Sequence, residues 1–87
     1  MSAYLAEVPA IVAASERKAV LPRNLAKPEE TSVYVAIRCA HEELDELAAA
    51  IRDNEPMEAI EDEAGDVLNF VAMAVRIARA RRRMVTA

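Results

Sequence analysis

The sequence predicts an all-α protein, and three of its features indicate this fold class. Alanine, glutamate and arginine are abundant, with 19 alanines among 87 residues, and these are strong helix formers. The chain has one glycine, whereas sheets need turns rich in glycine or asparagine. Apolar residues recur at helical spacing in two long segments. We therefore expect an antiparallel helical hairpin preceded by an N-terminal helix, within a single domain over residues 1–87.

The first expected helix covers residues 3–20. Pro9 is tolerated in the first turn of a helix but costs about 3 kcal/mol in its interior. The helix should therefore begin near Glu7 or bend there. A loop over Leu21–Lys27 should follow, because breakers gather in and beside it: Pro22, Asn24 and Pro28.

The second expected helix runs to about Asp53, with Thr31 or Ser32 as its cap. Its apolar positions are separated by alternating steps of four and three residues: Val33, Ile37, Ala40, Leu44, Leu47 and Ile51. This spacing forms a narrow apolar seam, which is typical of antiparallel bundles and coiled coils.

The third expected helix runs from about Pro56 to Arg82, after a break at Asp53–Pro56. Its seam has the same steps: Ile60, Ala64, Val67, Val71, Ala74 and Ala78. The short connection makes the two long helices antiparallel neighbours. Because an alanine-rich core contains little side-chain volume, we expect a second subunit to complete it. The expected assembly is a homodimer or homotetramer with a four-helix type of bundle.

The charge distribution excludes some partners. Residues 42–66 contain eleven acidic residues and one basic residue, and residues 67–87 contain five arginines and no acid. A nucleic-acid-binding domain spreads positive charge over a docking face, so we expect no nucleic-acid partner.

No apolar run approaches the roughly 20 residues of a membrane span. The single Cys39 fits a reducing, cytoplasmic setting.

Two pairs of acidic residues have the same spacing on the two long helices. Glu43 and Glu46 are three residues apart, as are Glu63 and Asp66, so each pair lies on one helix face. Each pair also has the same offset from its seam. Packing the two seams together should therefore bring four carboxylates to one edge of the interface.

Four crowded carboxylates repel one another and lose hydration near a core. A hard divalent cation, Mg²⁺ or Mn²⁺, would compensate them, since such ions prefer oxygen ligands. A bound cation would in turn recruit phosphates and stabilise charge that develops during phosphoryl transfer. The spacing thus indicates phosphoanhydride chemistry.

Two other interpretations of the acidic residues stay open. Glutamate-rich helix faces are usually solvated, so the chain could be a non-catalytic oligomerisation or interaction module with the same bundle. A di-iron carboxylate bundle is the weaker alternative. Such bundles usually contain Glu-x-x-His pairs, and His41 is the only histidine.

The acidic segments resemble those of a known family. Residues Glu42–Leu47 followed by Glu63–Leu68 are similar to the E-E-x-x-E and E-x-x-D signature of the MazG-like, all-α nucleoside triphosphate pyrophosphohydrolases. The second segment also resembles the family's E-L-G-D-V-L stretch, including the lone Gly65. The resemblance covers about residues 33–80.

This resemblance implies a Mg²⁺-dependent hydrolysis of a nucleoside triphosphate to the monophosphate and pyrophosphate. Four residues would hold the metal: Glu43, Glu46, Glu63 and Asp66. Glu42 would orient the attacking water, and the family assembles as dimers or dimers of dimers. Asn69, one turn beyond Asp66, could touch the substrate. Phosphate contacts would come from Arg76 and Arg79, or from basic residues before the first acidic segment: Lys18, Arg23 and Lys27.

Overall fold

The computed structural model describes residues 3–19 and 32–86, and within these ranges it contains helices and no strand. A short 3-10 helix, η1 (Ala3–Glu7), leads into three α-helices: α1 (Val8–Ala19), α2 (Val33–Arg52) and α3 (Met57–Thr86). The all-α prediction is confirmed.

The start of α1 follows from the position of Pro9. Helix α1 begins at Val8, directly after η1 ends at Glu7, so Pro9 lies in its first turn. A missing backbone N–H costs no hydrogen bond within the helix at that position. The expected helix start near Glu7 is thus confirmed. The loop predicted over Leu21–Lys27 lies outside the described residues.

Local backbone features define where α2 and α3 begin and end. Ser32 is the N-cap of α2, and its hydroxyl accepts a hydrogen bond of 3.1 Å from the backbone N–H of Tyr34. After α2 ends, Asn54 adopts a left-handed conformation with φ of 54°, which asparagine tolerates better than most residues. The third helix begins at Met57 and extends to Thr86, beyond the expected end at Arg82.

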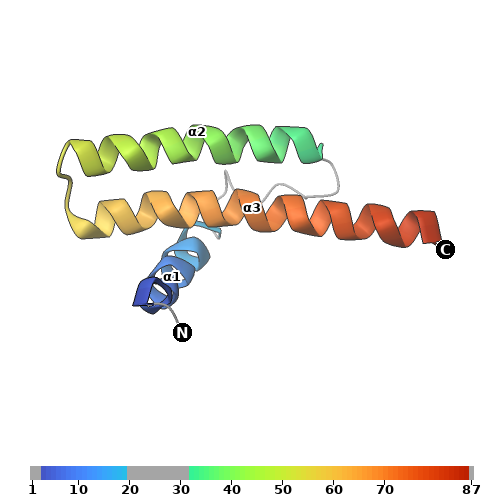
Figure 1. The fold of residues 1–87 in the computed structure, drawn as a ribbon, viewed down its shortest axis with the longest axis horizontal. Coiled ribbons are helices and arrows are strands. Elements are labelled where there is room, and N and C mark those ends of the chain that lie inside the picture. Colours follow the sequence, from blue (N-terminus) through green and yellow to red (C-terminus); the bar gives the residue numbers. More distant parts are fainter. Residues whose placement is uncertain (1–2, 20–31, 87) are drawn as a thin grey trace.

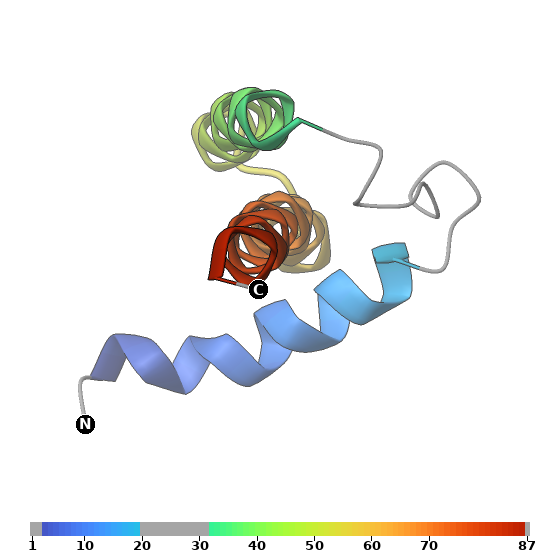
Figure 2. The same ribbon diagram turned by 90° about the vertical axis from the view of Figure 1, so that its right-hand side faces the viewer.

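Helix α3 is central, and both α1 and α2 pack against it. Helices α2 and α3 lie side by side and antiparallel (Figure 1). Helix α1 crosses α3 on the side opposite to α2, as the view along the hairpin shows (Figure 2). The central helix therefore has one face toward α2 and another toward α1.

Small residues form the core, and the predicted seam of α2 is only partly buried. Among the described residues, the buried apolar ones are Ala14, Ala36, Ala40 and Ala50. Of the predicted seam, Ile37, Leu44 and Ile51 are 44%, 46% and 58% exposed, so the contact within this chain buries only part of it. Alanines allow α2 to approach closely, and these larger side chains lie beside the contact.

The open packing also shows in the dimensions of the chain. Its radius of gyration is 14.3 Å, whereas a compact domain of this length has about 12 Å. No large side chain among the described residues is fully buried. None of the described helices combines the length and the apolar character that crossing a bilayer requires.

Candidate metal centre

Three of the predicted ligands converge between α2 and α3. Glu43 from α2, with Glu63 and Asp66 from α3, each offers a carboxylate oxygen, and these oxygens lie within 4.8 Å of one another. All three residues are half-buried. We call these three residues the acidic cluster. The matched i, i+3 spacing that predicted a shared edge thus leads to a compact group of carboxylates.

Glu46, the fourth predicted ligand, lies at the border of the acidic cluster. It is exposed, yet its carboxylate is close enough to help raise the pKa values of both Glu43 and Glu63. Its position one helical turn after Glu43 explains this reach. Glu46 therefore faces the cluster from its solvent side.

The position of Glu43 on α2 explains its burial. It is three residues after Ala40 and seven before Ala50, both of which are buried, so it lies on the same helix face. Glu43 Oε2 is buried without a hydrogen-bond partner among the described residues, as is Glu63 Oε2. A buried polar atom without a partner costs about 1–3 kcal/mol. These two oxygens therefore indicate that the cluster is incomplete without a ligand.

The electrostatics of the acidic cluster favour protonation when no cation is bound. Burial raises the pKa of Glu43 from 4.5 to about 7, and further causes are a hydrogen bond to Glu46 and the charges of Asp66, Glu46 and Glu63. Burial likewise raises the pKa of Glu63, and the neighbouring Glu46 and Asp66 raise it further, while the charge of Lys18 lowers it. A divalent cation would reverse this preference, because it stabilises the charged carboxylates.

The chemistry of the donors suits a hard divalent cation. The acidic cluster offers only carboxylate oxygens, which Mg²⁺, Mn²⁺ and Ca²⁺ prefer over nitrogen or sulfur donors. Within the described part of the chain, two of its oxygens are buried without hydrogen-bond partners. His41 does not belong to the cluster and lies instead beside an apolar groove. The described residues thus fit Mg²⁺ or Mn²⁺ better than a site with histidine ligands.

Helix α1 crosses α3 directly beside the acidic cluster, and Gly65 permits the close approach. A Cβ at Gly65 would lie 2.7 Å from the backbone N of Ser15 and 2.9 Å from the carbonyl carbon of Ala14. Asn69 Nδ2 donates a hydrogen bond of 3.2 Å to the carbonyl oxygen of Ser15. The hydroxyl of Ser15 donates one of 2.6 Å to Asn69 Oδ1. The crossing is therefore fixed by backbone contact and by two hydrogen bonds.

The crossing places two basic residues of α1 against acids of α3. Lys18 Nζ lies 3.3 Å from Asp66 Oδ2, and Arg17 forms an ion pair of 2.9 Å with Asp62. Sequence reasoning named Lys18 only as a possible phosphate contact and missed its pairing with Asp66. Ser15 and Lys18 have the same i, i+3 spacing as Asp66 and Asn69, but this signal has meaning only once the crossing is known.

The remaining predicted site residues lie farther from the cluster or are already engaged. Glu42, Arg76 and Arg79 are exposed. At 1.5 Å per residue, Arg76 lies about 15 Å along the axis of α3 from Asp66. Asn69 is hydrogen-bonded to Ser15. Their contacts with substrate stay predictions.

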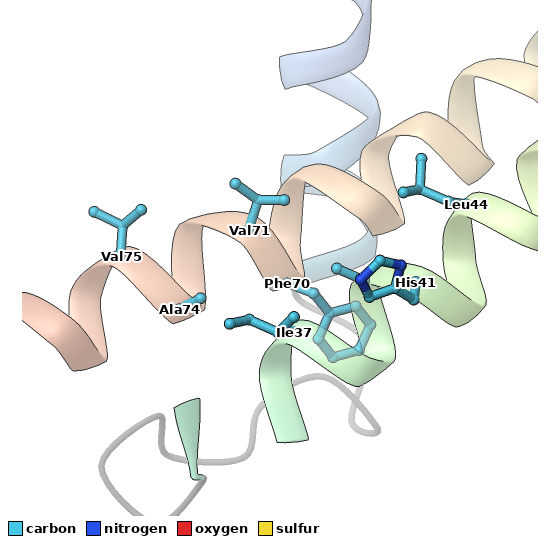
Figure 3. A pocket seen from close by; sticks show the side chains of 8 residues that line it. Ile37, His41, Leu44, Phe70, Val71, Ala74 and Val75 are labelled. Atoms are coloured by element: carbon cyan, nitrogen blue, oxygen red, sulfur yellow. The ribbon is translucent and has the colours of Figure 1, made fainter. Parts of the chain in front are cut away.

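An apolar groove lies between α2 and α3, toward the start of α2 (Figure 3). Its volume is about 200 Å³. The groove is lined by Ile37, Ala40, His41, Leu44, Phe70, Val71, Ala74 and Val75. Leu44, Val71 and Val75 are each about half exposed. The α2–α3 pair thus has a substantial uncovered apolar face in the single chain.

Comparisons with known proteins agree with the geometry of the acidic cluster. The model of the MazG nucleotide pyrophosphohydrolase domain matches residues 32–86, which is more than half of the chain and includes α2 and α3. A search among curated proteins and one among solved structures gave no significant match. The matched segment confirms the resemblance expected from the two acidic motifs. The chain therefore belongs to the MazG nucleotide pyrophosphohydrolase domain family.

Proposed function

We propose that the chain hydrolyses a nucleoside triphosphate between its α- and β-phosphates, giving the monophosphate and pyrophosphate. The proposal is supported by family membership and by one observation above all. Glu43 and Glu63 each present a buried carboxylate oxygen without a partner among the described residues, within a group of three converging carboxylates. Such a group needs a cation, and a cation between carboxylates recruits phosphates.

The residues divide into two roles in this proposal. Glu43, Glu46, Glu63 and Asp66 hold Mg²⁺, with Mn²⁺ as the alternative ion. When bound, the cation neutralises phosphate charge and lowers the pKa of water. Glu42, which precedes the first ligand and is exposed, orients the attacking water and accepts its proton.

Basic and amide side chains complete the substrate site in the proposal. Arg76 and Arg79 bind phosphate oxygens, for which the guanidinium group offers bidentate geometry. Asn69 binds the base, sugar or phosphate through its amide, after exchange of a hydrogen bond with Ser15. Because Arg76 lies about 15 Å along α3 from Asp66, an arginine of a second subunit could reach the cluster as readily.

A second copy of this chain covers the apolar groove in the proposed assembly. The groove and the half-exposed Leu44, Val71 and Val75 around it are typical of an interface core rather than of a solvated surface. Pairing two α2–α3 hairpins gives a four-helix bundle. The proposed functional unit is thus a homodimer, or a homotetramer made from two such dimers.

A hydrolysis panel tests the proposed reaction. The purified protein is incubated with Mg²⁺ and each common or damaged nucleoside triphosphate, and the products are separated by chromatography. We expect equimolar monophosphate and pyrophosphate from at least one nucleotide. EDTA should abolish the reaction, and Mn²⁺ should restore it.

Two variants serve as controls in the hydrolysis panel. Glu46→Ala removes a proposed ligand and should abolish turnover. Glu58→Gln alters an exposed acid in the first turn of α3, outside the cluster, and should leave turnover unchanged. Intact nucleotides throughout the panel would contradict the proposal and would favour a non-catalytic interaction module with the same fold.

A further inference from the structure

We infer that Lys18 is a built-in counter-ion of the acidic cluster, which a divalent cation must displace from Asp66 when it binds. The inference rests on the proposed metal site. Lys18 Nζ lies 3.3 Å from Asp66 Oδ2. The side chains of Lys18 and Asp66 are only 19% and 13% exposed, so solvent screens this pair less than a surface pair.

The position of Lys18 is imposed by the crossing of α1 and α3. Backbone contact at Gly65 and the two hydrogen bonds between Ser15 and Asn69 fix α1 at that point. Lys18 follows Ser15 by three residues, so it lies on the same face of α1. The contact between α1 and α3 therefore places Lys18 beside the acidic cluster.

The charge of Lys18 acts on more than one member of the cluster. It lies beside Asp66 and also lowers the pKa of Glu63. Without a cation, the ammonium group offsets part of the repulsion among the carboxylates. With a divalent cation on the same carboxylates, the ammonium group and the metal repel each other. The two positive charges therefore compete for Asp66.

The source of this lysine distinguishes it from the proposed ligands. All four proposed ligands lie within residues 32–86, the segment that the family model matches. Lys18 belongs to α1 (Val8–Ala19), outside that segment. Competition by Lys18 would thus be a property that this chain adds to the hairpin, and it would set the cation concentration at which the site fills.

Titration calorimetry with Mn²⁺ alone tests the competition. Lys18→Met removes the charge and keeps a flexible apolar stem of similar length. We expect it to bind Mn²⁺ about tenfold more tightly than the wild-type protein, which is within the usual range for coupling between two binding events. Lys18→Arg retains the charge and should bind Mn²⁺ within twofold of wild type.

Arg17→Met is the matched control, because Arg17 is paired with Asp62 outside the acidic cluster. It should leave the Mn²⁺ dissociation constant unchanged. A lysine that only docks α1 would alter the melting temperature but not the dissociation constant. Equal or weaker Mn²⁺ binding by Lys18→Met, beside measurable binding by wild type, would overturn the counter-ion inference alone. If neither protein binds Mn²⁺, both this inference and the proposed metal site fail.

A measurement on the wild-type chain covers the case in which Lys18→Met does not fold. Acetylation of Lys18 by a small anhydride is followed by mass spectrometry, with and without saturating Mn²⁺ and relative to an added reference peptide. Release of the ammonium group from Asp66 should raise the acetylation rate of Lys18 severalfold. An unchanged or lower rate in Mn²⁺ would overturn the inference.

Discussion

The two faces of α3 differ in how completely this chain covers them. Toward α1, a glycine contact, two hydrogen bonds and two ion pairs close the interface. Toward α2, two buried carboxylate oxygens lack partners among the described residues, and an apolar groove stays open. The α1 crossing is thus satisfied within one chain. The hairpin, in contrast, carries features that a cation and a second subunit would complete.

The largest expected effect comes from the incomplete face. Glu63→Gln keeps the shape of the side chain but removes a charge from the acidic cluster. Loss of groups that merely orient metal ligands costs about 10–100-fold, so loss of a ligand should lower kcat/KM by at least about 100-fold. The measurement is the initial rate of pyrophosphate release at saturating Mg²⁺. A variant within threefold of wild type would contradict a role for Glu63 in the site.

The second prediction concerns the groove beside the acidic cluster. Leu44→Glu places a charge at the uncovered apolar surface, where burial against a second copy would cost several kcal/mol. Since each 1.4 kcal/mol is tenfold in affinity, the dimer dissociation constant should rise by at least about 100-fold. Light scattering after size exclusion should then show a monomer.

Met57→Glu is the matched control for the groove. Met57 is 66% exposed at the start of α3 and does not line the groove, so this variant should assemble as the wild type does. Dissociation of both variants, or of neither, would show that the groove is not the contact between subunits.

The third prediction tests the closed face. Gly65→Ala adds a Cβ that would lie 2.7 Å from the backbone N of Ser15, and overpacking costs about 1–3 kcal/mol. The higher helix propensity of alanine returns about 1 kcal/mol. The two nearest atoms belong to the backbone of α1, so the cost should lie near the upper end of that range, and the free energy of unfolding should fall by about 2 kcal/mol in urea titrations. Ala72→Ser also adds one atom to α3, at an exposed position, and should change it far less. Equal stability of Gly65→Ala and wild type would contradict the close crossing.

The last prediction concerns the pH dependence of the metal-free protein. The pKa of Glu43 is raised from 4.5 to about 7 in the fold, so the folded state binds more protons than the unfolded state. The stability from this proton is complete below pH 4.5 and is lost as the pH rises through 7. The melting temperature in EDTA should therefore fall between pH 5 and pH 8. Glu43→Gln should flatten this slope, and an equal slope in both proteins would contradict the pKa shift.

The helices were predictable because their determinants are local. Ser32 before an amphipathic run, Pro9 in a first turn and the break around Asn54 all act within a few residues. The convergence of Glu43, Glu63 and Asp66 was predictable for the same reason. It needs only two helical periods and a short connection between them.

Features that depend on the contact between helices were not predictable from spacing. Large apolar residues indicated a seam through Leu44, but the alanines approach more closely and leave Leu44 half exposed. The crossing of α1 at Gly65 brings together residues about 50 positions apart. The helical period of α1 or α3 does not determine where or at what angle the two helices cross. The pairing of Lys18 with Asp66 therefore emerged only from the structure.

Thermal melting with and without Mg²⁺ tests the central claim most directly. If the acidic cluster is a cation site, ligand binding to the folded state should raise the melting temperature progressively through millimolar Mg²⁺. The rise should be larger at pH 8 than at pH 5, since the carboxylates must be deprotonated to bind, and Glu63→Gln should lack it. An identical melting temperature with and without Mg²⁺ at pH 8 would contradict the account.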